Sequence, residues 1–449
     1  MRPDLSGFRH VAAAAAFLGC LLAGPAGAAP LLSDLTFSTG IGWSDNITGV
    51  ASNQQSETIA AVGVRAIIDR NSRLFDLGLN LDMQYIDYLR NNFTSELAGN
   101  SELHARFAVV PEVLSLVVED TFGQTQANAF APSTPGTRQN TNLLAVGPDL
   151  RLNLGEYLMF LGSGRYALED FQRTNADNER FQGTTGIYHE FSGRSSLGVL
   201  VQAQDVNFES AQFSDFIRRE ALMRYRLNAS RTTIQLDAGR TEFRGRGVTP
   251  VRYNQWSFRF EASRNLTARS TLELSVGRIV SDSGELLATS LGSTRDRSTL
   301  AQTGLGAIQT VGANVVGTGD ALRNLYGRAT WRFVGPRSRA NIAFESRQER
   351  YITGSSISRN VYSVLAGVSR DFSQRLTLAT DLRYSERDAE TVTIVVKDSA
   401  AALTGIYRVT PRIGLSLSFE YANRDDNAGG GDYSDRRAWL GLSYSPIAQ

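Results

Sequence analysis

The residues that could carry out chemistry are few, and their spacing favours no catalytic site. Beyond residue 29 the histidines are His104 and His189. Catalysis needs a convergent nucleophile, base and orienting group, and neither histidine stands in a motif that would supply them. His104 alternates with Glu102 and Arg106 as on a polar strand face, and His189 ends a patterned segment beside Glu190. We therefore interpret His104 as a lumen residue and His189 as a solvated residue near a turn, and expect no enzyme.

Metal, phosphate and thiol chemistry have no better support. Histidine and cysteine nowhere cluster with ligand spacing, and the single Cys20 lies in the N-terminal apolar stretch. The run Gly429–Gly431 is followed by Asp432 in an expected hairpin loop, where flexibility is its ordinary role. With 46 basic and 45 acidic residues, the net charge of +1 gives no basic surplus for nucleic acid. The sequence predicts no cofactor, no metal and no nucleic-acid partner.

Polar side chains recur instead on one face of alternating segments, most clearly in Phe75–Tyr85. Its odd positions are apolar, and its even positions carry carboxylates, amides and a glycine. Side chains of a β-strand alternate between two faces, so this segment predicts a strand with one apolar and one polar side. At roughly 3.3 Å per residue and a tilt near 45°, the apolar side spans about 23 Å vertically. That height is close to the roughly 25 Å lipid-facing band of an outer-membrane barrel.

The polar faces of such strands hold the candidate functional residues, which would line a lumen. They are Asp76, Asn80, Asp82, Arg218, Glu220, Arg224, Arg226, Arg259, Glu261, Arg328, Arg332, Asp381 and Arg383. Charges in the middle of strands suit a water-filled lumen and would not be tolerated in the core of a β-sandwich. Either these mixed charges pair across strands and stiffen the wall, or they form a polar conduit for an anionic or hydroxyl-rich solute. Their mixed sign argues against strong ion selectivity.

The first 29 residues have the pattern of a cleavable signal peptide. Arg2 and Arg9 precede an apolar run over residues 11–22, and small residues close the segment at Ala26–Ala29. Acylation at Cys20 is the less favoured alternative, because the apolar run continues beyond it. No later stretch is long and apolar enough for a transmembrane helix. We expect a signal peptide over 1–29, a β-barrel over 30–449 and export to the bacterial outer membrane.

Short polar turns alternate with longer polar loops along the chain, as in outer-membrane barrels. The expected short turns lie near 69–72, 111–112, 154–156, 192–193, 228–230, 265–267, 335–337, 372–374 and 410–412. The expected longer loops cover 44–57, 124–142, 173–178, 244–250, 282–320, 386–391 and 424–434. Nine short turns join eighteen strands, and the first and last strands bring the total to about twenty. Eighteen stays possible because the segment 399–408 is weakly patterned. The predicted fold class is all-β, a transmembrane antiparallel up-and-down β-barrel.

Aromatic residues near strand ends support a membrane position, since they mark the two interfaces of a barrel. The residues assigned to these girdles are Trp43, Tyr85, Tyr88, Trp331, Phe333, Trp439 and Tyr444. The last strand, 437–444, ends on an aromatic residue, as is common for barrels inserted by the outer-membrane assembly machinery. The longest connection, 282–320, could fold into the lumen as a constriction or lie outside as a loop.

Three stretches resemble the bacterial β-barrel porins associated with exopolysaccharide and exosortase (PEP-CTERM) systems. They are Trp43–Ile47 after the first strand, Leu79–Tyr85, and Val118–Gln124 leading to Arg138–Asn142. The resemblance covers most of the chain after the signal peptide, through short motifs, and carries no catalytic residue. It implies an outer-membrane protein that accompanies the production or secretion of surface polysaccharide.

The leading functional hypothesis is therefore a non-enzymatic outer-membrane barrel, serving as a conduit or accessory protein in exopolysaccharide export or a related envelope pathway. The alternative is a general diffusion porin for small polar solutes. The expected partners are the lipid bilayer, the outer-membrane assembly machinery, and polysaccharide or components of an export system.

Overall fold

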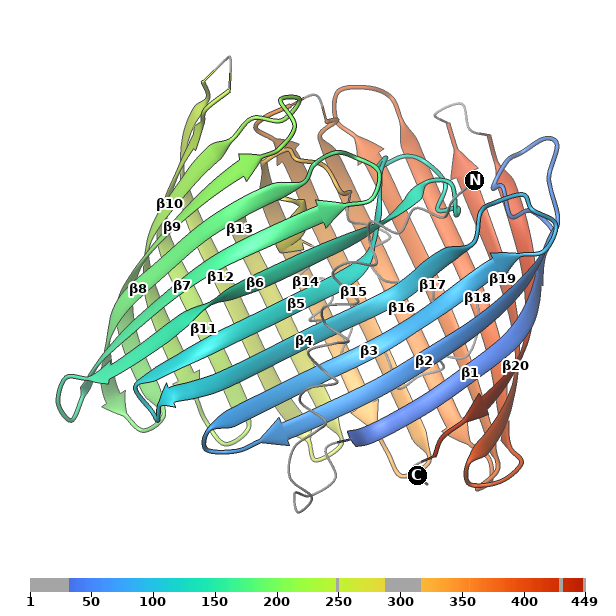
Figure 1. Cartoon of the computed structure of the whole chain (residues 1–449), viewed down its shortest axis with the longest axis horizontal. Helices are drawn as coiled ribbons and strands as arrows, with labels where there is room; N and C mark the ends of the chain where they lie inside the picture. The colour runs from blue at the N-terminus through green and yellow to red at the C-terminus, as the bar shows by residue number, and fades with distance from the viewer. Residues whose placement is uncertain (1–31, 248–249, 287–315, 355, 428–430, 447–449) are drawn as a thin grey trace.

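A computed structural model describes residues 32–247, 250–286, 316–354, 356–427 and 431–446. These residues form one closed antiparallel β-barrel of twenty strands (Figure 1). Each strand pairs with its two sequence neighbours, and β1 closes the barrel against β20 from Phe37↔Tyr444 to Ser44↔Arg437. The predicted fold class and the strand count of twenty are confirmed.

The strands are β1 (Leu32–Ser44), β2 (Glu57–Asn71), β3 (Phe75–Tyr88), β4 (Glu96–Val110), β5 (Leu114–Gln126), β6 (Arg138–Asn153), β7 (Leu158–Phe171), β8 (Asn178–Ser192), β9 (Ser195–Phe208), β10 (Phe216–Asn228), β11 (Thr232–Gly245), β12 (Arg252–Thr267), β13 (Ser270–Ser281), β14 (Leu322–Val334), β15 (Ser338–Tyr351), β16 (Arg359–Asp371), β17 (Leu376–Ala389), β18 (Val395–Arg408), β19 (Ile413–Asp426) and β20 (Tyr433–Tyr444). The weakly patterned segment 399–408 belongs to β18, which pairs along its length with β17 and β19.

Short turns and long loops lie at opposite ends of the barrel (Figure 1). The nine expected turns all fall where hairpins connect at one end, within three residues of the expected positions. The largest offsets are at the turn expected over 69–72, which lies at 72–74, and at the turn expected over 265–267, which lies at 268–269. The long loops connect the strands at the other end, which we call the long-loop end. Three of its connections, 89–95, 209–215 and 352–358, did not appear among the expected loops. Each contains an apolar residue that packs inward, namely Phe93, Phe213 and Ile352, so composition alone does not mark it as a polar loop.

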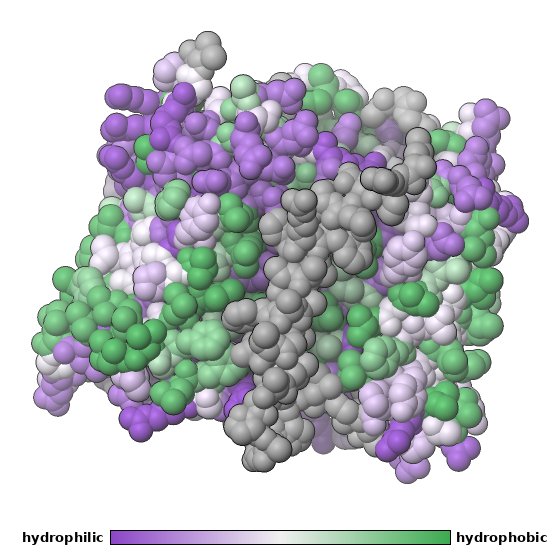
Figure 2. Space-filling model, viewed as in Figure 1, coloured by the Kyte–Doolittle hydropathy of each residue, from purple (hydrophilic) through white to green (hydrophobic). Residues whose placement is uncertain are grey.

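The outer wall carries the apolar side chains that alternation predicts. Exposed examples, one on each strand except β4 and β7, are Trp43, Val62, Tyr85, Leu116, Val146, Phe181, Val199, Met223, Leu236, Trp256, Val276, Leu325, Phe344, Tyr362, Leu382, Leu403, Phe419 and Leu440. In Figure 2 hydrophobic residues form a band across the middle of the wall, and hydrophilic residues gather towards the long-loop end. An exposed apolar band of this kind needs lipid to cover it. No helix among the described residues has the length and hydropathy to cross a membrane.

Two aromatic residues expected in the interface girdles point inward instead. Tyr88 is 3% exposed and Trp439 is 7% exposed, and both pack in an apolar cluster with Ile59 and Ile86 on the inner wall. A strand end brings an aromatic residue near the interface, but the parity of its position decides which face it takes. Trp439 alternates with the outward Leu440, and Tyr88 has the parity of the polar face of β3. These two assignments were wrong.

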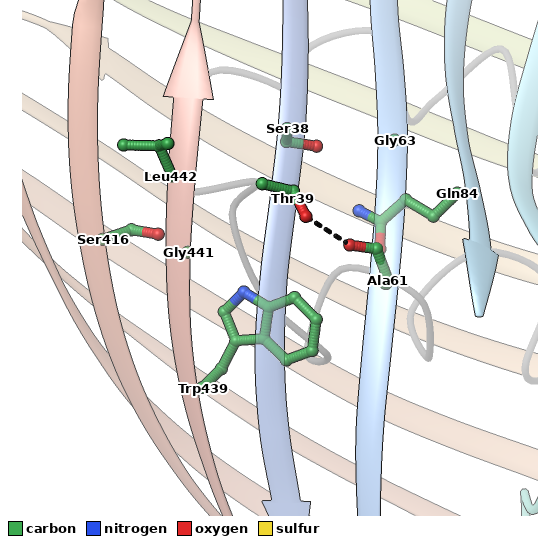
Figure 3. A pocket seen from close by; sticks show the side chains of 9 residues that line it. All are labelled: Ser38, Thr39, Ala61, Gly63, Gln84, Ser416, Trp439, Gly441 and Leu442. Carbon is green, nitrogen blue, oxygen red and sulfur yellow. Dashed lines mark hydrogen bonds between the residues drawn. The ribbon is translucent and has the colours of Figure 1, made fainter. Parts of the chain in front are cut away.

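Small residues make room for Trp439 at the seam where β20 meets β1 (Figure 3). A Cβ atom at Gly40 would lie 2.5 Å from the Trp439 ring and 2.6 Å from the Leu440 carbonyl oxygen. Beside the indole, Gly441, Ser416 and Gly63 help line a cavity of about 10 Å³, which is the size of one water molecule. The seam therefore depends on glycine at position 40.

Candidate functional site: the inner wall and the loops folded into it

The structure places the candidate residues of the sequence on the inner wall. On each of their strands, residues of the opposite parity are the exposed apolar ones, such as Tyr85 on β3, Met223 on β10 and Leu382 on β17. The candidates fall into three sectors. Asp76, Asn80 and Asp82 lie on β3; Arg218, Glu220, Arg224, Arg226, Arg259 and Glu261 lie on β10 and β12; Arg328, Arg332, Asp381 and Arg383 lie on β14 and β17.

The sector around β10 forms a continuous network across three strands. The Arg224 guanidinium donates two hydrogen bonds to Asp237, at 2.6 and 2.7 Å. Arg259 lies 3.7 Å from Glu220, which also accepts a hydrogen bond from Thr241. Cross-strand pairing of opposite charges stabilises a sheet, so this network stiffens the wall.

Arg226 extends the same sector towards the short turns. It donates to the Gln235 side-chain oxygen at 3.2 Å and lies 5.4 Å from the centre of the Tyr188 ring. A guanidinium over an aromatic face gains electrostatic attraction from the ring. Glu261 is the direct cross-strand neighbour of Gln235.

The other two sectors also hold their charges in pairs. Arg332 donates to Glu273 at 2.5 Å, and Arg383 donates to Glu420 at 2.6 Å. Arg106 pairs with Asp76 on β3. The remaining candidates stand directly opposite polar partners in the strand register: Asp82 opposite Arg65, Asn80 opposite Glu102, and Arg328 opposite Glu345. Asp381 is two positions from Arg383 on the same face of β17.

A different group of arginines lies buried at the long-loop end, and the sequence singled out one of them, Arg218. The largest fully buried side chains of the described residues include Arg218, Arg359, Arg387 and Arg424. Arg180 on β8 is nearly as buried, with its side chain 5% exposed. A buried guanidinium is costly unless it is paired and hydrogen-bonded, so each must have partners.

Arg180 joins the wall to the start of the loop between β13 and β14. It donates to both carboxylate oxygens of Asp282, at 2.9 and 2.7 Å, and it pairs with Glu169 of β7. Asp282 begins one helical turn over 283–286, and its side chain accepts the backbone N–H of Glu285 at 3.1 Å. The Glu285 carboxylate then pairs with Arg218 of β10. The chain thus leaves β13 and turns inward against β7, β8 and β10.

The end of that loop lies against β5 and β6, across the lumen from β14, the strand that it enters. Val316 forms a parallel bridge with Gln126 of β5, and the Gly317 backbone N–H donates to the Gln126 carbonyl oxygen at 2.9 Å. The Gln139 amide donates to the Gly317 carbonyl oxygen at 3.1 Å. The two loop ends meet where Ser283 donates to the Thr318 carbonyl oxygen at 2.7 Å. Of the two courses that the sequence left open for 282–320, the described ends, 282–286 and 316–320, take the inward one, and residues 287–315 lie outside the described part.

The loop between β5 and β6 also leans across the lumen (Figure 1). Arg387 of β17 donates to the Gln126 side chain at 3.1 Å and to the Ala129 carbonyl oxygen at 2.9 Å. Arg424 of β19 donates to the carbonyl oxygens of Phe130 and Ala131. Both arginines share the carboxylate of Asp398. The loop over 127–137 is therefore held by the wall formed by β17, β18 and β19.

Two carboxyl groups in the inward-folded loops respond to their burial differently. Burial raises the pKa of Asp320, whose partner is the Ser356 hydroxyl. Burial would also raise the pKa of Asp282, but the charge and hydrogen bonds of Arg180 outweigh it, so the pKa of Asp282 is lowered. Asp282 is therefore held as a carboxylate by its cationic partners.

Neither histidine of the described residues lies in a catalytic arrangement. His104 Nδ1 is 3.4 Å from Glu119 on the inner wall, where both side chains are partly exposed. His189 contacts the rings of Tyr157 and Phe191. Within the described ranges, no group of three or more histidine, cysteine, aspartate or glutamate residues could hold a metal ion.

Comparison with known proteins finds similarity to solved structures at low sequence identity only. No family model matches the chain, and no curated protein matches it. Among solved structures, it is similar to the FrpB iron transporter from Neisseria meningitidis (F5-1 variant, apoprotein form; 8% identity, TM-score 0.42), with 93% of this chain and 82% of that chain covered. It is also similar to the copper transporter OprC (10% identity, TM-score 0.42, 93% and 81% covered) and to the siderophore receptor PirA from Pseudomonas aeruginosa (10% identity, TM-score 0.41, 92% and 81% covered).

Proposed function

We propose that this chain is a non-enzymatic outer-membrane conduit for hydrophilic cargo, narrowed at its long-loop end by loops that fold into the lumen. One observation carries the proposal. A barrel with an exposed apolar band has a polar, charge-paired inner wall, and buried arginines hold two loops across one end of it. Water-filled barrels that pass solutes have polar interiors, and inward loops set what can pass.

The chemistry of the wall favours a hydroxyl-rich cargo over a strongly charged one. Its charges are largely neutralised in pairs such as Arg224–Asp237 and Arg332–Glu273. Amide side chains lie among them on the same face, including Asn80, Gln84 and Gln204. Paired charges and amides offer both donors and acceptors to sugar hydroxyls. Together with the resemblance to exopolysaccharide-associated barrels, this supports a role in exporting surface polysaccharide.

The first experiment measures single-channel conductance of the purified protein in planar bilayers. The wild-type chain should give a small or mostly closed conductance, because the loops narrow the lumen. Replacing residues 128–136 with a short Gly-Ser linker removes the β5–β6 loop without touching a strand, and should raise the conductance several-fold. A large, permanently open wild-type pore that the deletion leaves unchanged would contradict a narrowed conduit. That result would support the second candidate, a general diffusion porin for small polar solutes.

The second experiment tests the cargo. Proteoliposomes loaded with neutral oligosaccharides or with anionic solutes of similar size should release the oligosaccharides faster. The Arg332→Gln variant unbalances the Arg332–Glu273 pair and should reduce anion release further while leaving oligosaccharide release close to wild type. Genes for glycosyltransferases or chain-length regulators beside this one are expected for polysaccharide export and not for a general porin.

A further inference from the structure

Four arginines lie together on the outer wall, on the long-loop side of the apolar band. They are Arg219 on β10, Arg240 on β11, Arg252 on β12 and Arg278 on β13, which we call the arginine patch. Each has the parity of outward apolar residues on its own strand, such as Met223, Leu236, Trp256 and Val276. Three of the four are exposed, and Arg278 is partly exposed.

The patch lies at the level where the apolar band ends. Trp256 is 72% exposed, and its direct cross-strand neighbour is Arg240. Arg278 stands directly opposite Phe258, the next outward residue of β12. Tryptophan of a barrel wall prefers the membrane–water interface, which places the guanidinium groups at headgroup height.

The acidic residues beside the patch already have other partners. Glu242, which stands opposite Arg219, pairs with Arg244, and Asp205 of β9 pairs with Arg246 of the β11–β12 loop. Of the patch arginines, none is in an ion pair with a residue that the structure describes. An excess of positive charge therefore faces the membrane surface at this sector.

The same level of the wall carries acidic residues in other sectors. The outward residue beyond Tyr85 on β3 is Asp87, and the residue beyond Tyr384 on β17 is Glu386, which accepts the Tyr384 hydroxyl at 2.7 Å. Beyond Tyr421 on β19 come Asn423 and Asp425. Outward basic residues of other sectors have acidic neighbours: Lys397 stands opposite Glu386 and Asp425, and Arg350 pairs with Glu390. A cluster of basic residues without ion-pair partners among the described residues is thus a feature of the arginine patch, and a general need for charge at the interface does not account for it.

We propose that the arginine patch binds the phosphate groups of lipid headgroups in the leaflet on the long-loop side. Guanidinium groups bind phosphate oxygens through paired N–H donors, and they keep their charge at every physiological pH. A lipid supplies this contact better than free phosphate, because its acyl chains cover the neighbouring Trp256 and Phe258 while its phosphate meets Arg240 and Arg278. The inference goes beyond the proposed function, since it concerns the outer wall and not the lumen.

The test compares lipid retention by two variants of the full-length protein purified in detergent. The first, R219Q/R240Q/R278Q, removes charge from the patch; the matched control, K397Q/R436Q, removes exposed outward charge from β18 and β20. The probes are a bisphosphorylated glycolipid, its dephosphorylated form and inorganic phosphate. Heat-modified migration on gels verifies that both variants are folded. The patch variant should bind the phosphorylated glycolipid about tenfold more weakly than wild type, and the control should bind it like wild type.

Two results would overturn the proposal. If the wild-type protein retains the dephosphorylated lipid equally well, the apolar band alone accounts for lipid binding. If inorganic phosphate at millimolar concentration displaces the glycolipid, the site is one for free anion and the lipid source is wrong. Channel conductance of the patch variant should equal that of wild type, so failure here is distinguishable from failure of the proposed conduit.

Discussion

The lumen of this barrel has two regions built from the same residue types under different conditions. At the long-loop end, Arg180 and its partners Glu169 and Asp282 have side chains that are 5% exposed or less. Nearer the short turns, the Arg106 side chain is 50% exposed and its partner Asp76 is 20% exposed. Both are arginine–carboxylate pairs, but water reaches only the second.

The difference in hydration changes what each pair does. A solvated pair gains little, because water screens the attraction and holding two side chains together costs entropy. A buried pair does not necessarily stabilise the fold over an apolar alternative, yet removing one partner leaves an uncompensated charge in a dry site. The long-loop end is therefore rigid and sensitive to substitution, and the rest of the lumen is a tolerant, polar surface that a solute can contact.

The largest expected effect on stability comes from removing the arginine of a buried ion pair at the long-loop end. Arg180→Met leaves the carboxylates of Glu169 and Asp282 buried without their main cation, and should cost about 3–5 kcal/mol of unfolding free energy. Arg106→Met, the matched change in the solvated region, should cost less than about 1 kcal/mol. Guanidinium unfolding in lipid vesicles, followed by tryptophan fluorescence, measures both. Equal costs would remove the distinction between the two regions.

The second effect in size tests which face of a strand meets lipid and which meets the lumen. Leu382→Arg places a charge on the exposed apolar band of β17 and should cost about 2–4 kcal/mol and impair assembly. Its neighbour Asp381 is on the inner wall, so Asp381→Asn should leave stability nearly unchanged. Folding yield and unfolding in vesicles compare the two variants. Similar damage from both would contradict the assignment of faces.

Much of this architecture could be predicted from alternation alone. Phe75–Tyr85 defined both faces of β3, and the turn positions gave the number of strands, because a period of two and a polar break are local properties of the chain. The thirteen candidate residues follow from the same parity. Alternation cannot predict whether a side chain on the inner face is solvated or buried.

The buried arginines show why. Arg180, Arg387 and Arg424 have the same parity and type as solvated arginines of the wall, and they differ only in the loop that covers them. In each case the covering loop is far away in sequence. Arg180 binds Asp282 of the β13–β14 loop, whereas Arg387 and Arg424 bind the carbonyl oxygens of Ala129 and Ala131 in the β5–β6 loop. Such long-range contacts leave no local pattern. The sequence signal that was present is the position of these arginines near the ends of strands that enter long loops.

A third, smaller effect tests the packing of the inner wall at the seam. Gly40→Ala would place a Cβ against the Trp439 ring and the Leu440 carbonyl, and should cost about 1–3 kcal/mol through displacement of the indole. Gly183→Ala on β8 is the matched control, because nothing lies within 4 Å of its added Cβ. Tryptophan emission of the protein, to which Trp439 and three other tryptophans contribute, should shift in the first variant and not in the second. A neutral Gly40→Ala would mean that the seam is as loosely packed as the solvated wall.

The smallest expected effect concerns the pH dependence of the inward-folded loop. Because the pKa of Asp282 is lowered in the folded protein, its carboxylate stabilises the docked loop above the ordinary pKa of 3.8, and this contribution is lost as the pH falls further. Channel conductance should therefore rise when the pH drops below that value. Asp282→Asn removes the carboxylate and weakens the contact to Arg180 by about 1–2 kcal/mol at neutral pH, so it should raise conductance there and flatten the acid response. Asp320→Asn is the control, since burial raises the pKa of Asp320 and its carboxylate gives the folded loop no such advantage above pH 3.8. An acid response that persists in Asp282→Asn would assign the pH sensitivity to another carboxyl group and leave the Arg180–Asp282 pair with no part in holding the loop.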